Sequence, residues 1–204
     1  MRHRLALTLI PLAAALLVVA PDNAVAQDQV LLGGRPESVG GFGGPMVRVT
    51  QIAGETVLVA GGGGAFLLNR RFAIGGAGVG GTTAADVIIN GTAQRGEVDF
   101  GYGGLTLEVI TRPSKLVHAT YGVLIGGGAV SVWPDNLRPR NPTTAGDPFG
   151  AIEPQLGIEL NLSRFARIGI NGGYRFTFGN EIEGLVNSDL NGGSGTLLVR
   201  FGRF

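Results

Sequence analysis

The residues most able to take part in chemistry are charged side chains that alternate with apolar ones along extended segments. Eight titratable groups share the polar faces of these segments: Arg48, Glu108, His118, Glu153, Glu159, Arg167, Arg175 and Arg200. If lipid surrounds the segments, these groups point into the interior of a barrel, where an unpaired charge is costly. We therefore expect the arginines and glutamates to form a hydrogen-bonded network that fills the lumen. A gated ion path is the alternative role for the same residues.

His118 is the one candidate general base, because His3 belongs to the leader segment. A Ser-His-acid arrangement needs a serine at the same level, and Ser114 is available only on a predicted turn. A histidine that stands alone on a polar strand face is more often a hydrogen-bonded filler. We predict no catalytic residue.

Metal and nucleotide sites also lack their signatures. The chain has no cysteine, and Glu181, Glu183 and Asp189 do not match the spacing of an EF-hand. The glycine clusters 40–45 and 61–64 lack the following lysine and helix of a phosphate-binding loop. We predict no metal and no cofactor.

The segment 1–26 has the pattern of a secretory signal. Arg2 and Arg4 precede an apolar stretch over 5–20, and Ala24-Val25-Ala26 supplies a cleavage site. The apolar stretch is too short for a spanning helix. We expect export through the Sec pathway, cleavage after Ala26, an extended segment over 27–40 and one domain over 41–204.

The composition of the mature chain excludes some partners. Removal of the leader takes Arg2 and Arg4 from the 16 basic residues and Asp22 from the 15 acidic ones, which leaves 14 of each. Without a basic excess we expect no nucleic-acid partner. The 37 glycines are interleaved with Val, Ile, Leu and Phe, as in strongly curved strands, which favours an all-β fold over disorder.

Eight strands are predicted, and the alternation is clearest in the sixth and seventh. Their ranges are Phe42–Ile52, Thr56–Leu68, Phe72–Gly81, Val98–Thr111, Val117–Val132, Phe149–Leu162, Ala166–Phe178 and Gly193–Phe204. Most exceed the usual length of soluble strands and suffice to cross the hydrocarbon of a membrane. The predicted fold is an all-β, eight-stranded antiparallel up-and-down transmembrane barrel.

Short basic turns alternate with longer acidic loops. The turns are 69–71, 112–115 and 163–165, and the loops lie near 82–96, 133–148 and 179–192. Short turns belong in the periplasm and long loops outside. The loop acids either solvate the connections or bind divalent cations among lipopolysaccharide phosphates; we favour solvation.

Aromatic residues near the strand ends predict two membrane girdles. One comprises Phe72, Phe165, Phe201 and Phe204, and the other comprises Phe100, Tyr102, Trp133, Phe149, Phe176 and Phe178. Phase changes near Gly103-Gly104 and Gly126–Gly128 suggest bulges. At the C-terminus, either Gly202-Arg203 forms a bulge or the assembly signal is atypical.

Several motifs carry a resemblance to known proteins. They are Gly40–Pro45, Gly61–Gly64 before Asn69, Gly75–Gly81, Tyr102-Gly103-Gly104 before Glu108, His118, Gly126–Gly128, Glu153-Pro154 and Tyr174-Arg175-Phe176. With these, the chain resembles a family of uncharacterised, glycine-rich exported barrel proteins of bacteria. It also looks like the small eight-stranded outer-membrane barrels. The resemblance implies an outer-membrane-like barrel with no assigned activity.

We therefore expect a non-enzymatic protein of the bacterial outer membrane with a structural, envelope-stabilising or surface-interaction role. The expected partners are outer-membrane lipid, lipopolysaccharide and the barrel-assembly machinery, and we expect a monomer. Three alternatives stay open: a narrow porin-like channel, a soluble periplasmic lipocalin-like lipid carrier, and a lipid A-modifying enzyme.

Overall fold

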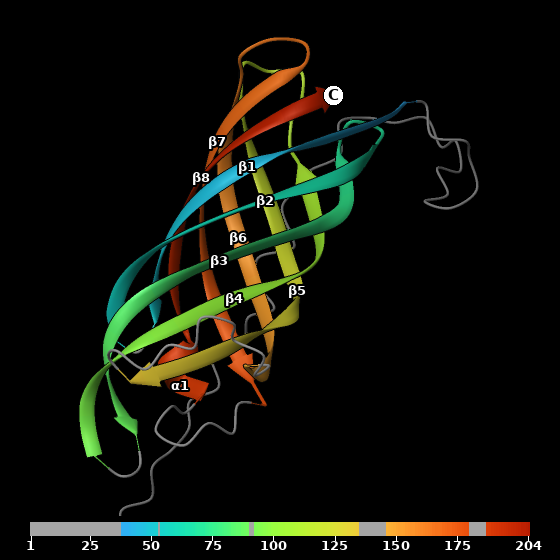
Figure 1. Ribbon diagram of the computed structural model, residues 1–204. Coiled ribbons are helices and arrows are strands. Elements are labelled where there is room, and N and C mark those ends of the chain that lie inside the picture. The colour runs from blue at the N-terminus through green and yellow to red at the C-terminus, as the bar shows by residue number, and fades with distance from the viewer. Residues whose placement is uncertain (1–37, 53, 90–91, 135–145, 180–186) are drawn as a thin grey trace, which may run out of the picture. The chain divides into compact units, whose positions relative to one another are not determined.

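Eight antiparallel strands close into a barrel (Figure 1). The structure is a computed structural model that describes residues 38–52, 54–89, 92–134, 146–179 and 187–204. The strands are β1 (Val39–Ile52), β2 (Glu55–Leu68), β3 (Phe72–Ile89), β4 (Thr92–Ile110), β5 (Val117–Pro134), β6 (Asp147–Asn161), β7 (Ala166–Phe178) and β8 (Gly192–Arg203). Each strand pairs with the next, and β8 pairs with β1. The predicted fold class is confirmed. The predicted leader and most of segment 27–40 lie outside the described residues.

The two ends of the barrel differ. The end that carries the connections 69–71, 111–116 and 162–165 is called the turn end here, and the opposite end the loop end. At the turn end Asn69 and Arg70 both have positive φ values, as the tight hairpin between β2 and β3 requires.

Two predicted loops contain regular structure. The region 82–96 is largely strand, because β3 and β4 continue to Ile89 and Thr92 in unbroken register. Its β-branched residues 87–89 favour an extended backbone. The region 179–192 contains a four-residue helix, α1 (Asn187–Leu190), whose Leu190 is fully buried. Among the described residues, no helix has the length and apolar character needed to cross a bilayer.

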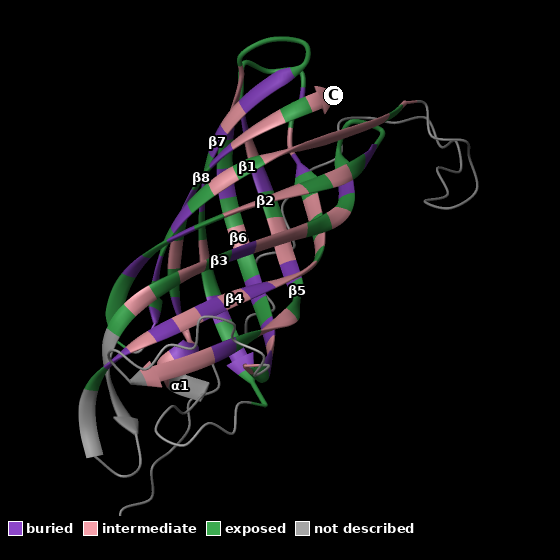
Figure 2. Ribbon diagram, viewed as in Figure 1, coloured by how far each residue is buried: buried purple, intermediate pink, exposed green. Residues whose placement is uncertain are grey.

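The two expected bulges within strands are absent. Gly103 and Gly104 pair in continuous register with β3 and β5, and Gly126–Gly128 pair continuously with β4 and β6. Buried and exposed positions alternate along the strands without a phase change (Figure 2). The polarity pattern shifts because the inward positions of β4 change from aromatic at the loop end to charged at the turn end.

The C-terminal strand has no bulge either. The register between β1 and β8 is the same on both sides of Gly202. Phe204 therefore shares the inward parity of β8, and its ring stacks on that of Phe42 with 5.7 Å between centroids. Phe204 does not belong to an outer girdle.

The predicted loop-side girdle is wrong for three of its aromatic residues. Phe100, Tyr102 and Phe149 are each only 4% exposed and lie inside the barrel. The rings of Phe100 and Phe149 stack there with 5.6 Å between centroids. Inward aromatic side chains fill this end of the lumen, together with Leu190 and aliphatic residues of the same cluster. Five other predicted girdle residues do have exposed side chains: Phe72, Phe165, Phe176, Phe178 and Phe201.

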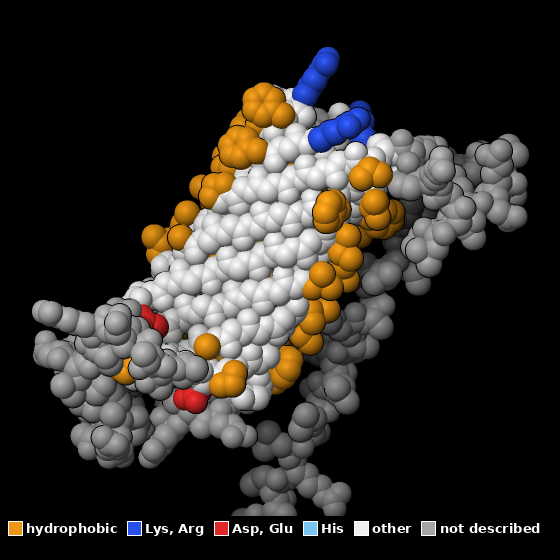
Figure 3. Space-filling view, turned by 45° about the vertical axis from the view of Figure 1, so that its right-hand side comes forward, with side chains coloured by type: hydrophobic (Ala, Val, Ile, Leu, Met, Phe, Trp, Pro, Cys, Tyr) orange, Lys and Arg blue, Asp and Glu red, His pale blue; other side chains and the backbone are white. Residues whose placement is uncertain are grey.

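Glycines serve two different surfaces of the barrel. On the inside, a Cβ atom at Gly128 would collide with the carbonyl oxygen of Gly101, so the close approach of β4 and β5 requires glycine there. On the outside, Gly62, Gly78 and Gly103 pair in register across three strands. They contribute to a broad band of bare backbone on the outer face (Figure 3).

Candidate functional site: two charged clusters inside the barrel

All eight predicted site residues have inward parity on their strands. Six of them, Arg48, His118, Glu153, Glu159, Arg167 and Arg175, are at most 4% exposed, and the side chains of Glu108 and Arg200 are 13% and 12% exposed. The closed sheet brings them together in two groups. The turn-end cluster consists of Glu108, His118, Glu159, Arg167 and Arg200. The loop-end cluster consists of Arg48, Glu153, Arg175 and a further residue, Tyr102.

Arg200 is the hub of the turn-end cluster. Its Nη1 and Nη2 donate to the two carboxylate oxygens of Glu108 at 2.6 and 2.7 Å, in bidentate geometry. Its Nη1 also lies 2.6 Å from Glu159 Oε1, an ion-pair contact without hydrogen-bond alignment. Charge-assisted bidentate pairs are among the strongest side-chain interactions, so Glu108 and Arg200 hold β4 and β8 together across the lumen.

Glu159 is shared among three neighbours. Its Oε2 lies 3.2 Å from His118 Nε2 and 3.6 Å from Arg167 Nη1. Among the described residues Arg167 has no other carboxylate contact, and its Nε has no hydrogen-bond acceptor. The Arg167 guanidinium instead lies over the Phe204 ring, 3.8 Å from the centroid, while that of Arg200 lies 4.4 Å from the centroid of Phe42. The stacked rings thus offer their faces to both arginines.

The loop-end cluster centres on Glu153. Its Oε2 accepts from Arg48 Nη1 at 2.9 Å and from the hydroxyl of Tyr102, which also contacts Arg48. Its Oε1 accepts from Gln155 Nε2 at 3.1 Å and from Ser194 Oγ at 3.0 Å. Every carboxylate oxygen of this fully buried glutamate therefore has a donor, as a charge in a low-dielectric interior requires.

Arg175 is stabilised without a carboxylate among the described residues. Its Nε donates to the carbonyl oxygen of Leu190 at 2.7 Å and its Nη2 to that of Gln51 at 2.8 Å. Its guanidinium also lies 4.8 Å from the centroid of the Phe100 ring. Carbonyl dipoles and an aromatic face offset the cost of burying the charge. This arginine consequently fixes α1 to the loop end of the lumen.

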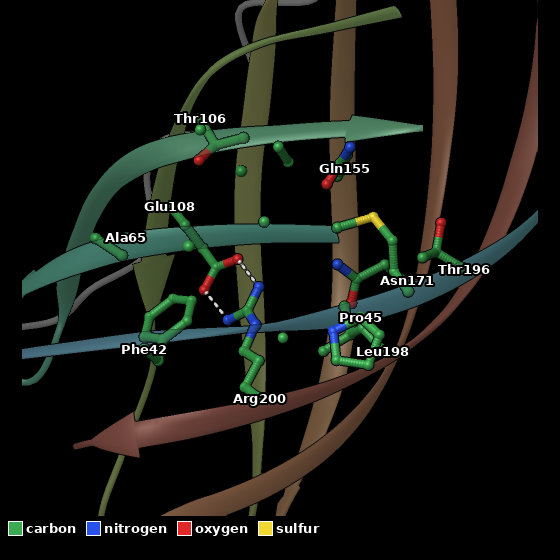
Figure 4. Close-up of a pocket in the computed structure, with 18 of the residues that line it drawn as sticks. Phe42, Pro45, Ala65, Thr106, Glu108, Gln155, Asn171, Thr196, Leu198 and Arg200 are labelled. Atoms are coloured by element: carbon green, nitrogen blue, oxygen red, sulfur yellow. Dashed lines mark hydrogen bonds and ion pairs between the residues drawn. The ribbon is translucent and has the colours of Figure 1, made fainter. Parts of the chain in front are cut away.

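A small cavity lies between the two clusters (Figure 4). Its polar wall includes Glu108, Gln155, Asn171, Thr196 and Arg200, and glycine and alanine residues of β2 and β3 form much of the opposite side. Its volume is about 60 Å³. Pockets for organic ligands usually measure roughly 300 to 1,000 Å³. The cavity has the size for a few water molecules rather than a lipid or a metabolite.

The chemistry of the clusters is charge pairing. Glu159 is the hydrogen-bonding partner of His118, and Ser114 is exposed on its turn. In the part of the chain that the structure describes, no group of three or more His, Cys, Asp or Glu side chains is arranged to hold a metal ion. Among the described residues of the two clusters, four arginines face three glutamates, and each of the three carboxylates contacts at least one arginine.

Sequence reasoning missed Tyr102 and the Phe42–Phe204 pair as partners of these charges. Tyr102 has the same parity in β4 as Glu108, so uninterrupted alternation would have placed it inside. The assumed bulge at Gly103 instead put it on the membrane side. No local signal identifies the stacking of Phe42 on Phe204, because the two rings meet only where the barrel closes.

The fold is similar to that of solved small eight-stranded outer-membrane barrels. The crystal structure of neisserial surface protein A matches with a TM-score of 0.55 at 10% identity, over 81% of this chain and 96% of that chain. The outer-membrane protein OprG of Pseudomonas aeruginosa matches with a TM-score of 0.50 at 9% identity, over 83% and 97% of the two chains. No protein-family model and no curated protein sequence matches the chain. The predicted likeness to small eight-stranded outer-membrane barrels is confirmed at the level of the fold.

Proposed function

We propose that the protein is a non-enzymatic integral protein of the bacterial outer membrane with a structural, envelope-stabilising or surface-interaction role, and that its charged clusters close the lumen. The observation that carries this proposal is the reversed distribution of polarity. Outward positions expose large apolar side chains such as Leu58, Phe66, Leu156 and Ile170, each 57–71% exposed, while the buried interior holds ion pairs.

This distribution suits lipid and not water. A soluble monomer rarely exposes a contiguous apolar patch larger than a few hundred Å². Here exposed Val, Ile, Leu and aromatic side chains occur on all eight strands. Strands of 12 to 19 residues are also longer than the roughly 9 to 11 tilted residues that cross the hydrocarbon. Backbone groups facing lipid are satisfied within the closed sheet.

The interior supports a closed structural barrel over the alternatives. A lipocalin-like carrier needs an apolar lumen large enough for a lipid, and the cavity between the clusters measures about 60 Å³. A continuous pore needs an aqueous path, and paired side chains from opposite strands occupy this lumen at two levels. Eight-stranded barrels are narrow enough to be filled by side chains in this way.

Export and assembly belong to the same proposal. Residues 1–26 act as a Sec signal that is cleaved after Ala26, and the barrel is inserted by the barrel-assembly machinery as a monomer in contact with lipopolysaccharide. Mass spectrometry of the protein recovered from membranes tests the first step, since the mature chain should begin at Gln27. An intact leader on the membrane-bound protein would contradict it.

The decisive experiment compares the electrophoretic mobility of the outer-membrane fraction with and without boiling in SDS. A band in that fraction that shifts on boiling is the expected result, because a closed barrel resists SDS until heat opens the sheet. The purified protein should then give no conductance steps in planar bilayers. A soluble protein without a heat shift would refute the membrane barrel, and regular conductance steps would refute the closed lumen.

A further inference from the structure

Six cationic side chains form a ring at the turn end. Arg70, Arg71, Arg112, Lys115, Arg164 and Arg203 are all exposed, and together they are called the basic collar here. Among the described residues, the carboxylates nearest this end in the strands are Glu108 and Glu159, and both lie inside the barrel. In the part of the chain that the structure describes, no exposed acidic side chain therefore lies among the collar residues. Figure 3 shows Lys and Arg side chains at one end of the barrel and Asp and Glu side chains at the other.

The cations are distributed around the whole circumference. They occur at four stations: the β2–β3 turn, the β4–β5 turn, the β6–β7 turn and the end of β8. Successive stations are two strands apart in the closed sheet, so no side of the barrel lacks a cation. A discrete soluble anion would meet only one side of such a ring. A continuous layer of anions around the barrel meets all four stations together.

Exposed aromatic side chains lie within or next to three of these stations. Phe72 follows the first turn and is 45% exposed, Phe165 lies within the third turn at 64%, and Phe201 precedes Arg203 at 50%. Aromatic rings of membrane barrels lie at the interface between hydrocarbon and headgroups. Cations one or two residues beyond them toward the barrel end lie at the depth of lipid phosphates.

We propose that the basic collar binds the phosphates of anionic glycerophospholipids in the leaflet that surrounds the turn end, and thereby fixes the depth and orientation of the barrel. This inference rests on the proposed membrane location. Five of the six collar residues are arginines, and guanidinium groups bind phosphate oxygens in bidentate fashion. The short turns keep these groups close to the membrane surface, and short turns face the periplasmic leaflet.

The test measures lipid selectivity of the folded mature protein in phosphatidylcholine vesicles. Spin-labelled phosphatidylglycerol and spin-labelled phosphatidylcholine are compared as probes, and electron paramagnetic resonance gives the ratio of their association constants at the barrel surface. A cation near an anionic membrane surface contributes about a fivefold preference. We expect a ratio of roughly five at low salt, declining toward one in 0.5 M NaCl because of screening.

The variant R70Q/R112Q/R164Q removes one cation from each of the three turns and leaves Arg71, Lys115 and Arg203. It should lower the ratio about halfway, to roughly three. A matched control, R95Q/R138Q/R140Q, removes three arginines that lie in sequence at or between strand ends opposite the turns, and should leave the ratio unchanged. The heat-dependent gel shift verifies folding and insertion of every variant. Each collar substitution lies on an exposed turn, so these variants should keep that shift.

The possible results distinguish the collar proposal from the proposed membrane location. A wild-type protein that inserts but shows a ratio of one overturns the collar proposal and leaves the outer-membrane proposal intact. A protein that fails to insert overturns both. Selectivity that soluble glycerol phosphate abolishes at millimolar concentration identifies a site for free phosphate instead of lipid. A collar-dependent preference for lipopolysaccharide over phosphatidylglycerol would overturn the assignment to the periplasmic leaflet.

Discussion

Glu159→Gln should destabilise the folded barrel, because it removes a charge that three side chains inside the barrel share. Glu159 is fully buried, and its carboxylate contacts His118, Arg167 and Arg200. The substitution keeps the shape of the side chain but removes the charge. Arg200 retains its bidentate pair with Glu108, whereas Arg167 loses its carboxylate contact and keeps the Phe204 ring.

The magnitude follows from the partners that remain. Removing one member of a buried ion pair usually costs about 3 to 5 kcal/mol, because the other charge stays buried without compensation. The contact between Arg167 and Glu159 is long, at 3.6 Å, and Arg200 keeps two short hydrogen bonds. We therefore expect a loss near the lower limit, about 3 kcal/mol in the free energy of unfolding.

The assay is urea unfolding of the mature protein in phosphatidylcholine vesicles, followed by the fluorescence of Trp133, the one tryptophan of the chain. The heat-dependent gel shift reports loss of the closed barrel independently. Glu55→Gln is the matched control, because Glu55 is exposed at the start of β2, and it should change stability by less than about 0.5 kcal/mol. An Arg167→Met background should reduce the cost of Glu159→Gln by at least about 1 kcal/mol, since the two residues interact directly.

Two results would contradict this account of Glu159. If Glu159→Gln and Glu55→Gln have equal effects, the carboxylate is not what stabilises the buried arginines. If Glu159→Gln costs the same with and without Arg167, the loss does not arise from an uncompensated Arg167 charge. Its origin would then lie in Arg200 or His118.

Further substitutions test the packing inside the lumen. Gly128→Ala should prevent folding, because the added methyl group would collide with the carbonyl oxygen of Gly101, and the gel should then show no band that shifts on boiling. Gly195→Ala is the control: it has open space around its Cβ position and should fold normally. Tyr102→Phe removes the hydroxyl that donates to Glu153 and should cost about 1.5 to 3 kcal/mol in urea unfolding; no change would show that the hydroxyl contributes nothing. Leu190→Ala should cost about 2 to 5 kcal/mol because α1 packs this side chain into the lumen, and an unchanged urea midpoint would contradict that packing.

The connections were the part of the fold that local patterns described least well. Apolar and polar residues alternate only weakly along residues 82–96. The strands β3 and β4 nevertheless pair with each other there, and the hairpin extends to Ile89 and Thr92. The helix α1 has only four residues, too few for a helical period to be recognised. Its position depends on Arg175, which donates to the Leu190 carbonyl from another element.

Alternation along each strand was enough to establish which side chains face inward. Side chains alternate across a strand with a period of two, so the parity of each predicted strand assigned Arg48, Glu108, Glu159 and the other site residues to one face. Where that rule was abandoned, at Gly103 and Gly126–Gly128, the prediction was wrong. The alternation is a local property of the extended backbone, and it needs no knowledge of the neighbouring strands.

The meeting of particular charges, in contrast, is a property of the closed barrel. Arg48 contacts Glu153, Arg200 contacts Glu108, and each pair joins strands that are not neighbours in the sheet. These meetings depend on the register at every strand pair and on the closure of β8 onto β1, which set the height of each residue in the lumen. Alternation is a property of one strand, whereas register is a relation between strands. The sequence of a single segment therefore could not show which arginine pairs with which glutamate.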